Sequence, residues 1–181
     1  MPLGERLSAV PALSRPELLA APVADALKAW PQGEQVLVTE IDPDLADTAA
    51  FCERYGVQLA ESANCVIVSG RRGEVTTLAA CVVLATTRAD VNSRVRRHLD
   101  VRKISFAAMD VAVAESGMEY GGITPIGLPG EWPLRVDRRV VEGGDVFVGS
   151  GVRRSKPVLP GALLADAPGA QVLDELAQAV G

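Results

Sequence analysis

The sequence has 181 residues, of which 48% are hydrophobic, and it carries a formal net charge of −5. This length and composition exclude a disordered chain and fit a single domain, residues 1–181, with a buried core. No apolar run approaches the roughly 20 residues that span a bilayer, and the first residues lack the basic and apolar regions of a signal peptide. The three cysteines are too widely separated for a CxxC metal site or a disulfide framework, so we expect a cytoplasmic protein without a membrane association or a metal.

Hydrophobic periodicity and turn residues divide the chain into short helices and strands. In chain order they predict a helix over 14–30, a strand over 36–41, a helix over 43–56, a hairpin over 63–70 and 74–85, a helix over 88–100, a strand over 102–107, a helix over 109–117, strands over 133–137 and 145–151, and a final helix over 166–181. Residues 1–20 are an N-terminal extension. Gly56 and Gly117 are expected to end their helices. Gly73 is expected at the hairpin turn, and Pro22 breaks the first helix. This order predicts an α/β domain with a mixed sheet.

The predicted helix over 88–100 contains a local concentration of positive charge. Residues 1–60 hold nine acidic and four basic side chains, which account for the whole net charge. The later basic cluster consists of Arg88, Arg94, Arg96, Arg97, Arg102 and Lys103. A solvated helix face and a surface that binds phosphates are both open interpretations of this cluster.

The segment after the predicted helix at 109–117 is rich in glycine and proline. From Tyr120 to Gly130 it reads YGGITPIGLPG. Gly121 and Gly122 permit backbone conformations with positive φ and let a ligand approach closely. Successive N–H groups in such a loop can bind an anion or an oxyanion. A plain surface loop of turn residues is the alternative interpretation.

Side chains that would indicate a common catalytic or metal site are scarce. The one histidine, His98, cannot form a His-rich metal site, and the sequence has neither a GxSxG motif nor a Walker A loop. Asp137 and Asp145 flank a predicted hairpin, where a role in the turn is the better interpretation. Cys65 and Cys81 lie in apolar strand patterns that predict core positions. We therefore expect no cofactor, and the main chain of the glycine-rich loop is the candidate source of polar contacts.

Several segments, taken in order, resemble those of one known family. The segments SANCVIVSG, ISFAAMDVAVAESGMEYGGITPIGLP and VFVGSGVRRSK resemble the YbaK family, which is related to the editing domain of bacterial prolyl-tRNA synthetases. The resemblance covers residues 20–165, and its strongest part contains the family's GxxxP element from Gly121 to Pro125. It implies a mixed α/β fold with a bent, partly barrel-like sheet and surrounding helices. It also implies hydrolysis of the ester of mischarged tRNA without a metal, with aminoacyl-tRNA as the partner.

The same resemblance implies a site between the strand at 63–70 and the glycine-rich loop, where water attacks the ester and the loop amides hold the oxyanion. The catalytic residues that it implies are Asn64, Gly121, Gly122 and Ser150. The implied substrate-binding residues are Cys65, Thr124, Pro125, Gly149, Gly151 and Arg153. The residues expected to contact tRNA phosphates are Arg94, Arg97, Arg102 and Lys103.

At one position the sequence departs from the family's pattern. Active relatives carry a lysine in an AKT-like tripeptide of the first hairpin strand, and here the tripeptide is Ala63-Asn64-Cys65. Asparagine forms hydrogen bonds but carries no charge. The resemblance thus implies a freestanding trans-editing aminoacyl-tRNA deacylase, and the alternative is an inactive module that binds tRNA ends or a small ligand. An aminoacyl-tRNA synthetase is a further expected partner, and a monomer and a homodimer are both open.

Overall fold

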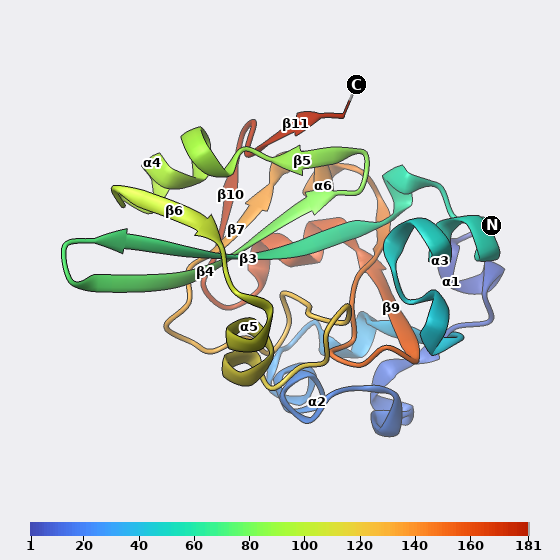
Figure 1. Cartoon of the computed structure of the whole chain (residues 1–181). Helices are drawn as coiled ribbons and strands as arrows, with labels where there is room; N and C mark the ends of the chain where they lie inside the picture. Colours follow the sequence, from blue (N-terminus) through green and yellow to red (C-terminus); the bar gives the residue numbers. More distant parts are fainter. Residues whose placement is uncertain (181) are drawn as a thin grey trace.

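The computed structural model describes residues 1–180 and has the mixed α/β fold that the sequence predicts (Figure 1). The strands are β1 (Val10–Pro11), β2 (Leu37–Glu40), β3 (Ala63–Arg72), β4 (Val75–Leu84), β5 (Thr87–Ala89), β6 (Lys103–Phe106), β7 (Leu134–Asp137), β8 (Asp145–Phe147), β9 (Ser155–Pro160), β10 (Ala170–Leu173) and β11 (Ala177–Ala179). The α-helices are α1 (Leu3–Arg6), α2 (Ala21–Ala29), α3 (Thr48–Tyr55), α4 (Arg96–His98), α5 (Met109–Ser116) and α6 (Arg138–Glu142). The shorter helical turns are η1 (Ala12–Ser14), η2 (Pro16–Leu18), η3 (Gly33–Gln35), η4 (Pro43–Leu45), η5 (Leu59–Glu61), the π-helical η6 (Val91–Val95) and η7 (Gly161–Asp166).

The predicted hairpin forms the centre of the larger sheet. β3 and β4 pair in register from Ala63 opposite Leu84 to Arg72 opposite Val75, and Gly73 has a φ of 60° at the turn. The strand order of this sheet is β10–β7–β4–β3–β6, with β7 parallel to β4 and β10 parallel to β7. In Figure 1 the hairpin extends to the left beyond the other elements.

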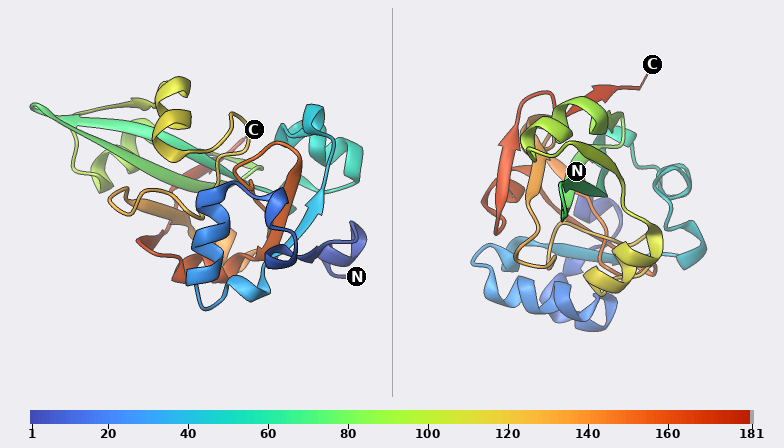
Figure 2. Two further views of the ribbon diagram at one scale, coloured as in Figure 1. Left: turned by 90° about the horizontal axis from the view of Figure 1, so that it is seen from below. Right: turned by 60° about the vertical axis from the view of Figure 1, so that its left-hand side comes forward.

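Two smaller sheets complete the fold. One has the order β1–β2–β9–β8, and the other consists of β5 and β11. Over residues 1–180 all three sheets are open, so the expected barrel-like bend does not produce a closed barrel. The views in Figures 1 and 2 place α2 and α5 on one side of the hairpin and α4 and β11 on the other. Within the described chain, no helix combines the length and hydropathy that a membrane crossing requires.

The main hydrophobic core joins helix α2 to the two larger sheets. It includes Val23 and Leu27 of α2, Val82 of β4, Val136 of β7 and Val146 of β8, all nearly inaccessible to solvent. Because burial of apolar area is the dominant favourable term in folding, this cluster fixes how the sheets lie relative to each other.

Glycines end two of the helices, as predicted. Gly56 follows α3 with a φ of 67°, and Gly117 follows α5 with a φ of 70°. Both residues are in the left-handed conformation, which glycine adopts without the steric cost of a Cβ atom. The helix predicted over 14–30 begins later than expected, at Ala21 of α2. Pro22 lies in the first turn of α2, where a proline is tolerated, and does not interrupt the helix.

The prediction of a final helix over 166–181 was wrong for the part of it that the structure describes, and Gly181 lies outside the described residues. Gly169, with a φ of 76°, redirects the chain after η7. The tail then forms β10, which pairs with β7, and β11, which pairs with β5. An apolar period does not show which distant strands are available for pairing, and tertiary pairing overrides helix propensity here.

Two other predictions, for the segment 88–100 and for the pair Asp137 and Asp145, also need correction. The segment 88–100 is not one helix, because it starts in β5 and continues through η6 into α4. Asp137 and Asp145 do not flank a hairpin, since β7 and β8 belong to different sheets. The Asp137 carboxylate accepts from the N–H groups of Arg139 (2.9 Å) and Ala177 (3.0 Å), so it caps α6 and holds the C-terminal tail.

Candidate functional site

The first strand of the hairpin has an open edge close to its start. β6 pairs with β3 only from Val68 onward, and Ser62, just before β3, forms an isolated bridge with Phe147. The N–H of Ala85 donates to the C=O of Ser62 (2.8 Å), so even-numbered residues of β3 turn their main-chain groups toward β4. The main-chain N–H and C=O of Cys65 therefore face the open edge.

A cavity of about 640 Å³ lies at this edge. Its polar lining includes Asp47, Asn64, Gly121, Arg153 and Lys156. Its apolar lining includes Ile67, Phe106, Ala112 and Ile123. The cavity, which we call the edge cavity, is assembled from β3, β6, β9, α5 and loops, and its volume is typical of a small-molecule site.

Asn64 is held in place by the first turn of α3. The hydroxyl of Thr48 donates to Asn64 Oδ1 (2.7 Å). Because this bond occupies the amide oxygen, the NH₂ group of Asn64 remains as a pair of donors at the edge cavity.

The glycine pair forms a tight turn beside the edge cavity. The N–H of Gly122 donates to the C=O of Glu119 (3.0 Å), and Gly121 has a φ of 77°, as the third position of a type II turn requires. A Cβ atom at Gly121 would also lie 2.4 Å from Nη1 of Arg153. Within residues 1–180 the N–H of Gly121 has no hydrogen-bond partner, so it is a free donor where the turn meets the edge cavity.

Arg153 fastens this turn to the loop before α3. Its Nη1 donates to the C=O of Tyr120 (3.1 Å), and its Nε donates to the C=O of Pro43 (3.2 Å). Its main-chain N–H donates to the Glu119 carboxylate (2.9 Å), and its guanidinium lies 5.8 Å from the centre of the Tyr120 ring. Arg153 therefore sets the position of the turn and adds a positive charge to the edge cavity.

Lys156 is a cavity residue that the sequence analysis did not single out. It lies on β9, is only 6% exposed, and lines the edge cavity. Burial lowers the pKa of its ammonium; Cys52 and the Asp47 carboxylate oppose this shift, and the nearby Arg153 charge adds to it. No periodic signal marks it, because nearly every residue of β9 is buried; the one available signal was a lysine inside an otherwise apolar strand.

Two residues expected to be catalytic lie outside this lining. The N–H of Gly122 is committed to Glu119, so it cannot also donate to an oxyanion. Ser150 is fully buried, and its hydroxyl bonds to the C=O of Val152 (2.9 Å) and to Ser155 Oγ (2.7 Å). Both groups stabilise the loops behind the edge cavity, and the sequence motif could not separate this role from a catalytic one.

The expected substrate-binding residues divide in the same way. Cys65 and Gly149 line the edge cavity together with Arg153, whereas Pro125 lines a different cavity. Thr124 is fully buried, and Gly151 is packed against α2 with a φ of 82°. Burial raises the pKa of the Cys65 thiol, so the thiolate that a nucleophile would require is disfavoured.

The basic side chains expected to contact tRNA come from η6, α4 and β6: Arg94 lies in η6, Arg97 in α4, Arg102 just before β6 and Lys103 at its start. In Figure 1, α4 lies on the other side of the hairpin from α5. Arg94 forms an ion pair with Glu175 (2.8 Å), and Arg97 donates to Ser93 Oγ (2.9 Å). None of the four lines the edge cavity over the described residues.

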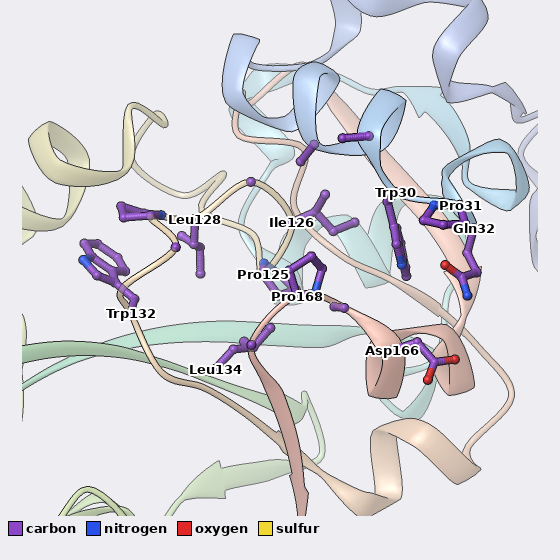
Figure 3. Close-up of a pocket in the computed structure, with 17 residues that line it drawn as sticks. Trp30, Pro31, Gln32, Pro125, Ile126, Leu128, Trp132, Leu134, Asp166 and Pro168 are labelled. Atoms are coloured by element: carbon purple, nitrogen blue, oxygen red, sulfur yellow. The ribbon is translucent and has the colours of Figure 1, made fainter.

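A second cavity, of about 650 Å³, is lined by the later part of the same loop. Figure 3 shows Trp30 and Trp132 at its two ends, with Pro125, Leu128 and Pro168 between them. We call it the tryptophan cavity. Its lining is mostly apolar, and we assign no chemistry to it.

The fold and the edge cavity together define a class of protein: a mixed α/β domain with a pocket whose lining includes free hydrogen-bond donors and cations. Across residues 1–180, no cluster of His, Cys, Asp and Glu is placed to hold a metal ion. The sequence matches the profile of the aminoacyl-tRNA editing domain over residues 42–167, and the chain belongs to this family.

Two solved structures are similar to this chain in fold. The hypothetical protein APE2540 is 24% identical, with a TM-score of 0.73, and the match covers 84% of this chain and 97% of that one. A proposed trans-editing enzyme for prolyl tRNA synthetase is 20% identical, with a TM-score of 0.72, and the match covers 86% of this chain and 94% of that one. No curated protein matches the sequence.

Proposed function

We propose that the protein is a freestanding trans-editing aminoacyl-tRNA deacylase, which hydrolyses the ester of mischarged tRNA. The observation that carries this proposal is the edge cavity, where an editing-family domain presents unpaired hydrogen-bond donors beside an open strand edge. The N–H of Gly121 and the NH₂ of Asn64 are two such donors, and the N–H of Cys65 faces the same edge.

In the proposed reaction, the oxygen of a water molecule forms a bond to the ester carbonyl carbon. The proton of that water passes through the neighbouring ribose hydroxyl to the departing ribose oxygen as the ester C–O bond breaks. The products are a free amino acid and an uncharged tRNA. Donors that point at the carbonyl oxygen lower the barrier because negative charge builds there, and each contributes about 3 kcal/mol in well-studied acyl transfers.

The terminal adenosine would bind at the rim of the edge cavity. Phe106 lines this cavity and is 61% exposed, which is unusual for a large aromatic side chain at the end of a strand. Exposed aromatic rings of this kind stack on unpaired bases. Arg88, an exposed residue of β5, lines two smaller depressions that also include Phe106, and it lies where a backbone phosphate would follow the base.

The basic residues around α4 and β6 remain part of the proposal as contacts with a more distant part of tRNA. Arg102 and Lys103 carry side chains without a hydrogen bond or ion pair within residues 1–180. A partnership with an aminoacyl-tRNA synthetase and a cytoplasmic location, where tRNA is charged, complete the proposed role.

Asn64 favours one alternative, a module that binds tRNA ends or a small ligand without hydrolysis. Its amide oxygen is already occupied by Thr48, and its side chain carries no charge. On this alternative the edge cavity would bind the aminoacyl end but would not stabilise the developing oxyanion.

The deciding experiment measures deacylation of a panel of misacylated tRNAs by the wild type and by Asn64→Asp and Asn64→Lys. Asp keeps the size of the side chain but replaces the NH₂ donors by an acceptor. The proposal expects hydrolysis of at least one ester by the wild type and a loss of about 10²-fold in Asn64→Asp. Hydrolysis that appears only in Asn64→Lys would support the binding module instead.

A further inference from the structure

Lys156 is a buried cation without a partner. The residue is only 6% exposed, yet over residues 1–180 its ammonium forms neither a hydrogen bond nor an ion pair. Lysine is almost never buried unpaired, because an ammonium loses its hydration there. The aromatic face of Phe51, 5.4 Å from Nζ, compensates only part of this loss.

The surroundings of Lys156 would suit an apolar residue better. β9 is central in its sheet, between β2 and β8, and Val158 and Leu159 of the same strand are core residues. Arg153 adds a second positive charge to the same cavity and does not relieve the first. A charged group retained against folding stability is typical of a functional site.

Asp47 is the acidic counterpart in the edge cavity, and it is also unusual. It occupies the N-cap position of α3, where aspartate normally accepts a hydrogen bond from the helix, but its side chain forms no capping bond. It is exposed, lines the edge cavity, and stays beyond ion-pair distance of Lys156. Over residues 1–180 the cavity therefore holds a positive and a negative group that form no ion pair, although the Asp47 charge favours the protonated form of Lys156.

An aminoacyl ester has the complementary arrangement of charge. Its α-ammonium group is positive, and its carbonyl oxygen, one carbon further along, becomes negative when water adds. The ammonium is repelled by the Lys156 and Arg153 cations and attracted by the Asp47 carboxylate.

We propose that Lys156 and Asp47 orient the aminoacyl group: the Lys156 ammonium donates a hydrogen bond to the ester carbonyl oxygen, and the Asp47 carboxylate binds the α-ammonium. This inference rests on the proposed deacylase function. The lysine keeps its proton throughout, so it stabilises the oxyanion and transfers nothing. The pair selects esters with a free α-amine over those whose amine is acylated.

The experiment compares Lys156→Met and Asp47→Asn with the exposed controls Lys28→Met and Asp25→Asn. Single-turnover rates are measured on a misacylated tRNA that the wild type hydrolyses and on the same tRNA after N-acetylation, together with Tm. Lys156→Met is expected to lose about 10²-fold in rate, while its Tm rises by about 2–4 °C because the buried charge is gone. Asp47→Asn is expected to slow the free-amine substrate to the rate of the N-acetylated one.

Two results overturn this inference while the deacylase function stands. One is an unchanged rate in Lys156→Met, and the other is a fall of Tm in that variant, which would make the lysine a structural residue. If the wild type hydrolyses no ester, the proposed deacylase function is wrong. The orienting role of Lys156 and Asp47 is then tested by ligand binding. An amide-linked aminoacyl-adenosine is then titrated calorimetrically: weaker binding to Lys156→Met and Asp47→Asn supports the orienting pair, and equal affinities or no binding overturn it.

Discussion

The two cavities lined by the loop after α5 have nearly equal volumes, about 640 and 650 Å³, but different chemistry. The tryptophan cavity is closed in by Trp30, Trp132 and several prolines, and its lining is mostly apolar (Figure 3). The edge cavity contains Lys156 and Asp47, whose charges the fold leaves unpaired. Volume alone does not indicate which of the two cavities is the functional site, whereas uncompensated polar groups indicate the edge cavity.

The difference has a structural origin in the loop itself. Gly121 lies in a turn that exposes its N–H, next to a strand edge that β6 leaves open. From Pro125 onward, proline removes main-chain donors, and Gly127 packs closely against the main chain of Pro22 and Val23 in the first turn of α2. One half of the loop can therefore contact a polar ligand, and the other half serves packing.

The largest expected effect separates the two cavities by stability. Trp132 is 7% exposed and forms one end of the tryptophan cavity, so Trp132→Ala should lower the free energy of unfolding by about 3–5 kcal/mol. The single-turnover deacylation rate at a temperature where the variant is folded should stay within about twofold of the wild type. Urea denaturation measures the loss of stability, and the deacylation assay measures the rate. A large loss of rate in folded Trp132→Ala would show that the tryptophan cavity also contributes to hydrolysis.

The next effect concerns the polar half of the loop. Gly121→Val should reduce the deacylation rate by about 10²–10³-fold, since the side chain strains a positive φ and displaces Arg153 beside the free N–H donor. The same strain should lower stability by about 1–3 kcal/mol.

The matched control for this prediction is Gly130→Ala in the same loop. A Cβ atom at Gly130 meets nothing within 4 Å, so both rate and stability should remain close to the wild type. A Gly121→Val protein that turns over at the normal rate would remove the turn from the mechanism.

A third prediction uses pH to detect the buried charge of the edge cavity. The titratable groups that face Lys156 are Asp47, Cys52 and Arg153, and burial lowers the pKa of the Lys156 ammonium below the ordinary lysine value. Between these two pKa values the unfolded chain binds more protons than the folded one, so stability rises with pH. Across this alkaline interval the free energy of unfolding of the wild type should therefore rise relative to that of Lys156→Met. The rise should be at most about 1.4 kcal/mol per pH unit.

Urea unfolding of both proteins at a series of pH values measures this gain, and Lys28→Met is the exposed control. Burial raises the pKa of the neighbouring Cys52 thiol above its ordinary value. A constant difference between wild type and Lys156→Met at every pH would show that the ammonium is hydrated in the folded state.

Local signals account for what the sequence could predict. Gly56, Gly73 and Gly117 were placed correctly because helix ends and tight turns need positive φ, which is a property of single residues. The tail and Lys156 were missed for a different reason. Pairing of β10 with β7, and burial of a lysine behind α3, depend on residues far away in the chain.

The candidate site shows the same limit on a smaller scale. The motif located Asn64 and Gly121 at the edge cavity, but it could not distinguish the free N–H of Gly121 from the bonded N–H of Gly122. That distinction is set by the turn that begins at Glu119, and a sequence motif contains residue types without their hydrogen bonds.

The smallest expected effect tests where the edge cavity ends and the tRNA surface begins. Phe106→Leu should raise KM for a misacylated tRNA by about tenfold with little change in kcat, because base–aromatic stacking contributes about 1–3 kcal/mol to binding. An amino acid methyl ester, which has no base, should be hydrolysed equally by both proteins, and Val75→Ala at the exposed hairpin tip is the control. An equal KM for tRNA in the two proteins would show that the terminal adenosine does not contact Phe106. A reduced rate of Phe106→Leu on the methyl ester would show that Phe106 contacts the aminoacyl group inside the edge cavity and does not stack on the nucleotide.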